Sequence, residues 1–290
     1  MELKYLVYKK EELEHGGHPD EDARRLFARV QRHGITVAEI SEGSLREYFW
    51  AKQILPELSL VIASTEETLK EAEALLAAAL GYQNPDFPDE PLGRVDYVAE
   101  GLEEVDVSFL ERVYQRKHGI PWRILETKRC YLREMTLSDL PDLYRLYEGE
   151  GMTKYMEPLY EREEEEAYAK AYIRTMYRFY GYGMWLVKDR VTNELIGRAG
   201  FDHYIENDET LLEMGYAIAA SRQRRGYATE VCEAMIAYAK EAAIGYDKLY
   251  CFVREGNAAS RALLLRLGFS FQTRTVRDGK DMLRYVRPLL

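Results

Sequence analysis

A basic, glycine-containing turn between two periodic segments is the most constraining feature of this 290-residue sequence. Residues 211–219 predict a strand and residues 229–243 predict a helix, and the turn Gln223-Arg-Arg-Gly-Tyr-Ala228 joins them. The first amides of a helix have no intrahelical acceptor, and the helix dipole adds partial positive charge there. A pyrophosphate can therefore bind at this turn, where Gly226 and Ala228 are small enough to let it approach the backbone.

Arg224 and Arg225 add positive charge to the turn, but an ordinary surface loop with a few arginines has the same composition. A second pattern lies about thirty residues further on. There Asn257-Ala-Ala-Ser260 opens a predicted helix, which follows a strand predicted over residues 248–253 and ends at Gly268. The two patterns together are far more specific than the turn alone.

The order of strand, basic turn, helix, strand, Asn-led helix and Gly-Phe strand resembles the GCN5-related N-acetyltransferase (GNAT) family. Within it, Glu213-Met-Gly-Tyr216 and Asn257-x-x-Ser260 resemble the group that includes the ribosomal-protein N-terminal acetyltransferases. The resemblance covers roughly residues 126–290, with Arg129-Cys-Tyr-Leu-Arg133 at its start and Leu195-Ile-Gly197 closing a hairpin.

This resemblance implies acetyl-CoA as cofactor and a primary amine, on a small molecule or a protein N-terminus, as acceptor. In such proteins the strand before the phosphate turn separates from the next parallel strand, and pantetheine inserts between them. The cofactor-binding residues that the resemblance implies are Ile218, Gln223, Arg224, Arg225, Gly226, Tyr227, Ala228, Asn257 and Ser260.

Acetyl transfer needs a base for the amine and an acid for the leaving thiolate. Glu213 is the predicted base, because strand alternation places it with Gly215 and Ala217 on the face that the family directs at the acceptor. A purely structural pairing of Glu213 with an arginine stays open as the alternative.

The usual acid of such enzymes is missing. Many relatives carry a tyrosine seven residues after the helix asparagine, and here that position is Leu264. Ser260 is the remaining candidate, with local hydrogen bonding inside its helix as the alternative. Asn257 can bind pantetheine, cap its helix, or do both.

Aromatic and acidic residues predict the acceptor pocket, since tyrosines with acids suit a cationic amine. The residues expected there are Tyr155, Glu157, Tyr160 and His203, with Asp202 and His203 as secondary base candidates. The chain contains 23 tyrosines, so simple packing is the alternative for each of them.

The first half alternates strand-length apolar runs with helical segments, among them helices expected over residues 65–79 and 107–117, which predicts a Rossmann-like parallel three-layer domain over residues 1–125. Residues 126–290 form the predicted mixed-sheet GNAT domain, with a long helix expected over residues 163–180. Leu60-Val-Ile-Ala-Ser64 weakly resembles the second motif of haloacid-dehalogenase-like phosphatases, where a serine or threonine holds phosphate. The aspartate pair of those enzymes is absent, so we expect a non-catalytic module that senses a ligand or presents acceptors.

The net charge of −10 lies mostly in residues 1–125, which hold 15 Lys and Arg against 24 Asp and Glu. This acidity disfavours nucleic-acid binding. The longest apolar runs, such as Leu75–Leu80, are too short for a membrane span, the N-terminus does not resemble a signal peptide, and three cysteines form no metal or disulfide pattern. We therefore expect a cytoplasmic protein without a metal, for which a homodimer is compatible with the sequence.

Two functions remain open at this point. One is an acetyl-CoA-dependent N-acetyltransferase, which the phosphate turn and Glu213 favour. The other is a catalytically weak acyl-CoA-binding sensor in which the first domain signals, which the absence of a tyrosine at Leu264 favours.

Overall fold

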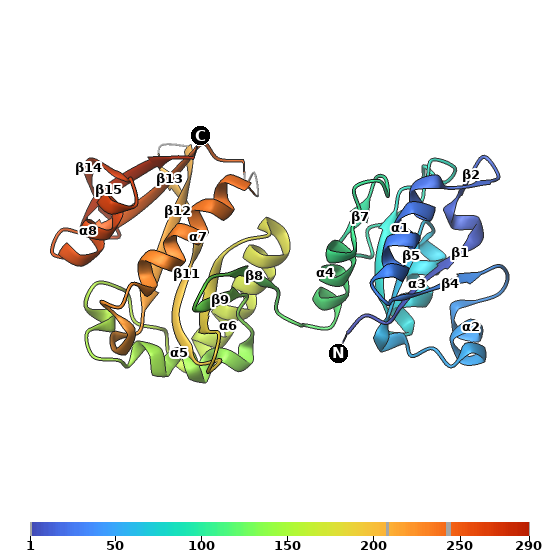
Figure 1. The fold of residues 1–290 in the computed structure, drawn as a ribbon, viewed down its shortest axis with the longest axis horizontal. Coiled ribbons are helices and arrows are strands. Elements are labelled where there is room, and N and C mark those ends of the chain that lie inside the picture. Colours follow the sequence, from blue (N-terminus) through green and yellow to red (C-terminus); the bar gives the residue numbers. More distant parts are fainter. Residues whose placement is uncertain (1, 207–208, 242–244, 290) are drawn as a thin grey trace. The chain divides into compact units, whose positions relative to one another are not determined.

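The computed structural model describes residues 2–206, 209–241 and 245–289. The chain divides into two compact units, residues 1–122 and residues 123–290 (Figure 1), close to the division expected at residue 125. Each unit has its own hydrophobic core. The predicted fold classes, a parallel α/β domain followed by a mixed-sheet α/β domain, are confirmed.

The first unit is a three-layer α/β/α domain around a five-stranded sheet in the order β4-β1-β5-β6-β7, all parallel. One buried cluster lies under α1 and α4, and another under α2 and α3 on the opposite face. The elements are β1 (Tyr5–Lys9), α1 (Glu21–Arg32), β4 (Thr36–Ile40), α2 (Leu45–Lys52), β5 (Ser59–Ala63), α3 (Glu66–Ala74), β6 (Ala78–Tyr82), β7 (Val98–Ala99) and α4 (Val107–Lys117). A two-stranded ribbon, β2 (Glu14–His15) with β3 (His18–Pro19), completes the unit.

Strand β1, helix α1 and the β2–β3 ribbon were not predicted from the sequence. Strand β1 pairs with both β4 and β5 inside the sheet, and α1 follows it. The helix expected over residues 65–79 ends at Ala74, because Leu76 adopts a left-handed φ of 62° and the chain then enters β6.

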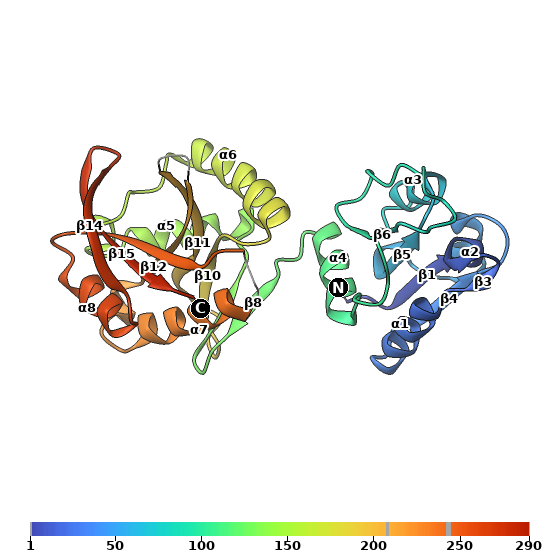
Figure 2. The same ribbon diagram turned by 90° about the horizontal axis from the view of Figure 1, so that it is seen from above.

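The second unit is built on an eight-stranded sheet in the order β14-β15-β13-β12-β11-β10-β9-β8 (Figure 2). Its neighbours are antiparallel except β12 and β13, which run parallel. The strands are β8 (Arg123–Glu126), β9 (Cys130–Arg133), β10 (Met184–Asp189), β11 (Leu195–Glu206), β12 (Glu209–Ile218), β13 (Lys248–Arg254), β14 (Ser270–Arg277) and β15 (Lys280–Pro288).

Helices cover both faces of this sheet. The helices are α5 (Leu140–Tyr147), α6 (Arg162–Tyr172), α7 (Tyr227–Glu241) and α8 (Ala258–Arg266), and α6 continues as a π-helix over Ile173–Tyr180. On β11, Phe201 packs against Tyr238 of α7, whereas Arg198 contacts Tyr147 of α5. Residues 198 and 201 of one strand face opposite ways, so α5 and α7 lie on opposite faces of the sheet. Among the described residues, no helix is long and apolar enough to span a bilayer.

Candidate active site

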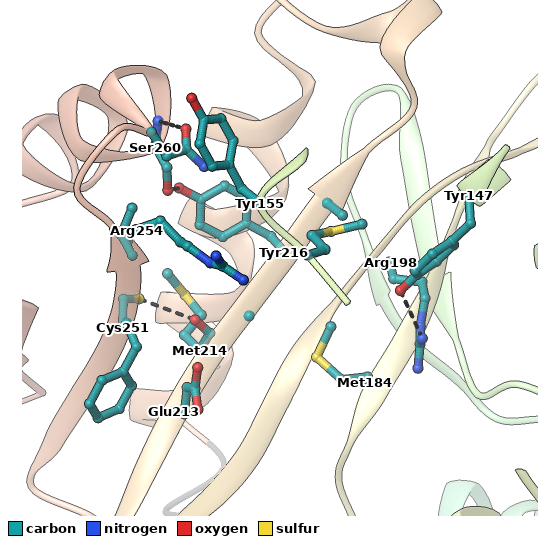
Figure 3. Close-up of a pocket in the computed structure, with 16 residues that line it drawn as sticks. Tyr147, Tyr155, Met184, Arg198, Glu213, Met214, Tyr216, Cys251, Arg254 and Ser260 are labelled. Carbon is teal, nitrogen blue, oxygen red and sulfur yellow. Dashed lines mark hydrogen bonds between the residues drawn. The ribbon is translucent and has the colours of Figure 1, made fainter. Parts of the chain in front are cut away.

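A cavity lies where the two parallel strands of the second unit separate. Strands β12 and β13 share a single register pair, Glu213 with Tyr250. Beyond it the strands diverge around a cavity of about 240 Å³ (Figure 3). The lining residues are Tyr147, Tyr155, Met156, Met184, Arg198, Glu213, Met214, Gly215, Tyr216, Ala217, Cys251, Phe252, Val253, Arg254, Asn257 and Ser260. Strand edges that separate in this way leave backbone groups for an extended ligand to pair with.

The turn after β12 presents a row of free backbone amides. Along this described stretch, none of the amides from residue 224 to residue 229 donates a hydrogen bond within the protein. Arg224 and Gly226 adopt left-handed φ angles of 57° and 81°, and α7 begins at Tyr227. Free amides at the start of a 15-residue helix form an anion-binding site that fits a pyrophosphate.

Arg129, the residue before β9, stabilises this turn by hydrogen bonds. Its Nη1 atom donates to the carbonyl of Arg225 at 2.9 Å, and its Nε atom donates to the Glu230 carboxylate at 2.7 Å. The guanidinium also lies over the Tyr227 ring, 4.0 Å from the centroid. Tyr227, which the sequence assigned to the cofactor, is thus buried under the turn, whereas Arg224 and Arg225 are exposed.

Gln223 and Ile218 contact each other directly. The Gln223 Nε2 atom donates to the Ile218 carbonyl at 2.9 Å, so this carbonyl is already hydrogen-bonded within the protein. Ala228 lies in the first turn of α7, partly buried. The bond ties the end of β12 to the residue that opens the turn.

Glu213 lines the cavity and pairs with an arginine, as the structural alternative for this residue expected. Its carboxylate accepts a hydrogen bond from Arg277 of β14, and the Arg277 guanidinium lies 4.4 Å from the Tyr204 ring centroid. Burial raises the pKa of Glu213, Arg277 opposes this shift, and Asp202, its register partner on β11, adds to it.

Tyr216 and Ser260 form a hydroxyl pair at the cavity wall. Their oxygen atoms are 2.7 Å apart, and the Ser260 amide donates to the Asn257 side chain at 3.1 Å (Figure 3). Asn257 therefore caps α8 as well as lining the cavity. Leu264, where relatives carry a tyrosine, is completely buried in the core and does not line the cavity.

The predicted acceptor residues are not all at the cavity. Tyr155 lines it and donates from its hydroxyl to the Gly256 carbonyl at 2.8 Å. Glu157 is exposed and pairs with Arg254 and Lys280, and Tyr160 is exposed as well. His203 hydrogen-bonds to the Tyr182 hydroxyl; it follows Asp202 on β11 and so points to the face opposite Glu213.

Arg198 and Met184 line the cavity without having been singled out from the sequence. The Arg198 Nη1 atom donates to the Tyr147 hydroxyl at 3.1 Å. A signal was present, since Arg198 is the one charged residue in the apolar segment Leu195-Ile-Gly-Arg-Ala-Gly-Phe201. Arg129 and Arg277 were also missed, because their partners lie far away in the sequence.

In the first unit, a side chain of the unit itself occupies the sheet edge where α/β domains of this kind bind ligands. In a sheet of this strand order, ligands bind beyond the carboxyl ends of β1 and β5. There the carboxylate of Glu12, only 2% exposed, accepts from the Ser64 amide at 2.6 Å and from the Thr65 hydroxyl at 2.9 Å. The Ser64 hydroxyl donates to the Glu12 carbonyl at 2.9 Å. Ser64 is therefore engaged by Glu12 at the position where the phosphatase resemblance would require phosphate.

Comparison with known proteins gives consistent matches for the second unit. The family model of the acetyltransferase (GNAT) domain matches residues 129–270. The uncharacterized N-acetyltransferase YoaA of Bacillus subtilis (strain 168) is 32% identical over 151 residues, which span 50% of this chain and 82% of that protein.

Solved structures show the same fold at lower identity. A GnaT-family acetyltransferase from Bordetella pertussis has a TM-score of 0.50 at 21% identity, over 57% of this chain and 99% of that chain. The ribosomal L7/L12 alpha-N-protein acetyltransferase RimL has a TM-score of 0.50 at 21% identity, over 58% of this chain and 94% of that chain.

Proposed function

Because the chain belongs to the GNAT acetyltransferase family, we propose that its second unit transfers an acetyl group directly to a primary amine of a small molecule or a protein N-terminus. Enzymes of this family use acetyl-CoA, which supplies the acetyl group as a reactive thioester. The observation that carries the proposal is the row of free amides at the start of α7, beside the cavity between β12 and β13.

The residues present fit this cosubstrate. The amides of residues 224–229 would bind the pyrophosphate, and Gly226 leaves them accessible. The diverging edges of β12 and β13, near Ile218 and Asn257, would bind the pantetheine as an added strand would.

Glu213 would accept the proton of the acceptor amine, directly or through water. A buried carboxyl with a raised pKa is a stronger base than an exposed one, because its ionised form is less well stabilised. Arg277 opposes that shift and favours the ionised form, which a base requires. Asp202 faces Glu213 across the strand pair and adds negative charge that would attract an ammonium group.

Ser260 and Tyr216 would return a proton to the departing thiolate, Ser260 donating from Oγ and Tyr216 replacing that proton. Burial raises the pKa of Tyr216, so its hydroxyl is protonated at the start of each turnover. The double variant Tyr216→Phe/Ser260→Ala should lose about 10²-fold in kcat with little change in acetyl-CoA affinity. Unchanged kcat would remove both hydroxyls from the chemistry.

The central test is Gly226→Glu, measured by calorimetric binding of acetyl-CoA and by thiol release over a panel of amines. A carboxylate at this position would repel the pyrophosphate, so binding and turnover should both be lost. Gly279→Glu is the matched control, because Gly279 also has a positive φ, 71°, and lies in the exposed turn between β14 and β15.

Two outcomes would overturn the proposal. Equal acetyl-CoA affinity in wild type and Gly226→Glu would remove the phosphate site from the turn. Tight binding by the wild type with no thiol release on any amine would instead favour an acyl-CoA sensor, the function that the buried Leu264 supports.

A further inference from the structure

Arg198 brings a positive charge to the cavity, and the described part of the chain supplies it with no countercharge. Its Nη1 atom donates to the neutral Tyr147 hydroxyl at 3.1 Å, and its Nε atom is buried without an acceptor from the described residues. Among the described residues, no carboxylate forms an ion pair with Arg198, and the groups that raise its pKa are the tyrosines Tyr147, Tyr177 and Tyr172.

Other arginines around this cavity are neutralised. Arg277 pairs with Glu213, and Arg254 pairs with Glu157. A guanidinium stays charged at any working pH, and a desolvated charge is costly unless an opposite charge compensates it. The planar fork of arginine matches the two oxygens of a carboxylate, so a carboxylate is the group that Arg198 is best suited to bind.

The placement of Arg198 relative to Glu213 sets the polarity of the cavity. On the paired strands β11 and β12, Arg198 faces Ala217, Gly200 faces Gly215, and Asp202 faces Glu213. Positive charge therefore lies at one end of this strip and negative charge at the other. Met184 packs over the glycine pair between them, with its sulfur 3.2 Å from where a Gly215 Cβ would lie.

We infer that Arg198 binds a carboxylate of the acceptor, and that the acceptor is a small amino acid in the chemical sense, an amine that also carries a carboxylate. This inference rests on the proposed acetyl transfer. The ammonium end would lie toward Glu213 and Asp202, and the carboxylate would complete the unpaired fork of Arg198. A free amino acid carries both charges in one small molecule, whereas a protein N-terminus supplies the carboxylate only through an acidic side chain.

The test compares matched substrates that differ only in the carboxylate. Thiol release is measured for free α-amino acids, for their α-carboxamides, for β-alanine and 4-aminobutyrate, and for short peptides with an acidic second residue. The wild type should prefer an acid over its amide by about 10- to 100-fold in kcat/KM, the range of one charge-assisted hydrogen bond.

Arg198→Gln should remove that preference by losing activity on the acid alone, and Arg198→Lys, which keeps the charge without the fork, should lose it in part. Arg254→Gln, which alters an already paired arginine at the same cavity, should keep the ratio of acid to amide. Equal rates on acids and amides in the wild type, an unchanged ratio in Arg198→Gln, or transfer confined to the acidic peptides would overturn the inference.

A binding measurement separates this inference from the proposed function. N-acetylamino acids and N-acetylamino amides are titrated into the full chain with CoA present. Preferential binding of the acid, lost in Arg198→Gln, supports the carboxylate site even if no amine is acetylated. Binding of neither compound, together with thiol release on amines that lack a carboxylate, leaves the transferase intact and refutes the carboxylate site.

Discussion

Glu213 and Arg277 form a pair whose balance should set the acidic limb of the pH profile. Arg277 lowers the pKa of Glu213 against the raising effect of burial. In Arg277→Gln the pKa of Glu213 should rise further, so a higher pH is needed to ionise this base. The acidic limb of kcat/KM should therefore move to higher pH, by about one unit or more, in profiles measured between about pH 5 and pH 9.

The controls for this prediction are close at hand. Glu213→Gln should abolish the limb together with most of the rate, whereas Arg254→Gln should leave the limb in place. If the limb stays where it is in Arg277→Gln, another group titrates there and Glu213 has only a structural role.

Some residues of the candidate site could be predicted from the sequence alone, and others could not. Gly226, Asn257 and Ser260 were identifiable because each belongs to a local pattern of strand, turn and helix. Arg277 was not, because it reaches Glu213 from 64 positions away, across two strands that join only in the folded sheet. Tyr216 lay inside a recognised strand motif, but its role depends on where α8 places Ser260.

At the scale of elements, the π-helix at the end of α6 holds the cavity wall. Tyr172 and Tyr177 are five positions apart, which is the hydrogen-bond spacing of a π-helix, and both hydroxyls reach the backbone of Met184. The Tyr172 hydroxyl accepts from the Met184 amide at 2.6 Å, and the Tyr177 hydroxyl donates to the Met184 carbonyl at 2.5 Å. Met184 is thereby fixed over Gly215.

Tyr172→Phe should lower the free energy of unfolding of the second unit by about 1–3 kcal/mol, since it leaves the Met184 amide without its partner. Tyr168→Phe, on the exposed side of the same helix, is the control and should change stability by less than about 0.5 kcal/mol. Urea unfolding followed by circular dichroism would measure both. A loss in Tyr172→Phe no larger than that of the control would contradict the assigned contact.

Elements differed in how well the sequence predicted them. The sequence predicted one helix over residues 163–180, and the structure continues α6 as a π-helix from Ile173, a change of winding that apolar spacing does not reveal. Strand β1 escaped notice because charged residues flank its apolar centre, although it lies inside the first sheet. The helix α4 was predicted with its observed ends, and the structure shows that Asp106 caps its start.

At the scale of the whole chain, each of the two units has its own hydrophobic core, and the contacts of Glu12 lie within the first unit. Glu12→Ala leaves the Ser64 and Thr65 amides without an acceptor and should destabilise that unit by roughly 2–4 kcal/mol. Glu12→Gln keeps one acceptor oxygen and should cost less. Differential scanning calorimetry of the full chain should show one transition lowered.

The second unit supplies the internal reference for this experiment. Calorimetric affinity for acetyl-CoA at 25 °C should be the same in Glu12→Ala and wild type, because the phosphate turn and the cavity lie within residues 123–290. A loss of affinity would mean that the first unit supports the cosubstrate site.

The single register pair between β12 and β13 affects which ligand specificities of this enzyme can change by mutation. Where a ligand is read by main-chain groups, most side-chain replacements nearby leave its recognition intact. The acceptor, on the inference above, would be bound by a few side chains such as Arg198. Random mutagenesis of the cavity should therefore yield variants with altered amine preference more often than variants that have lost their acetyl donor.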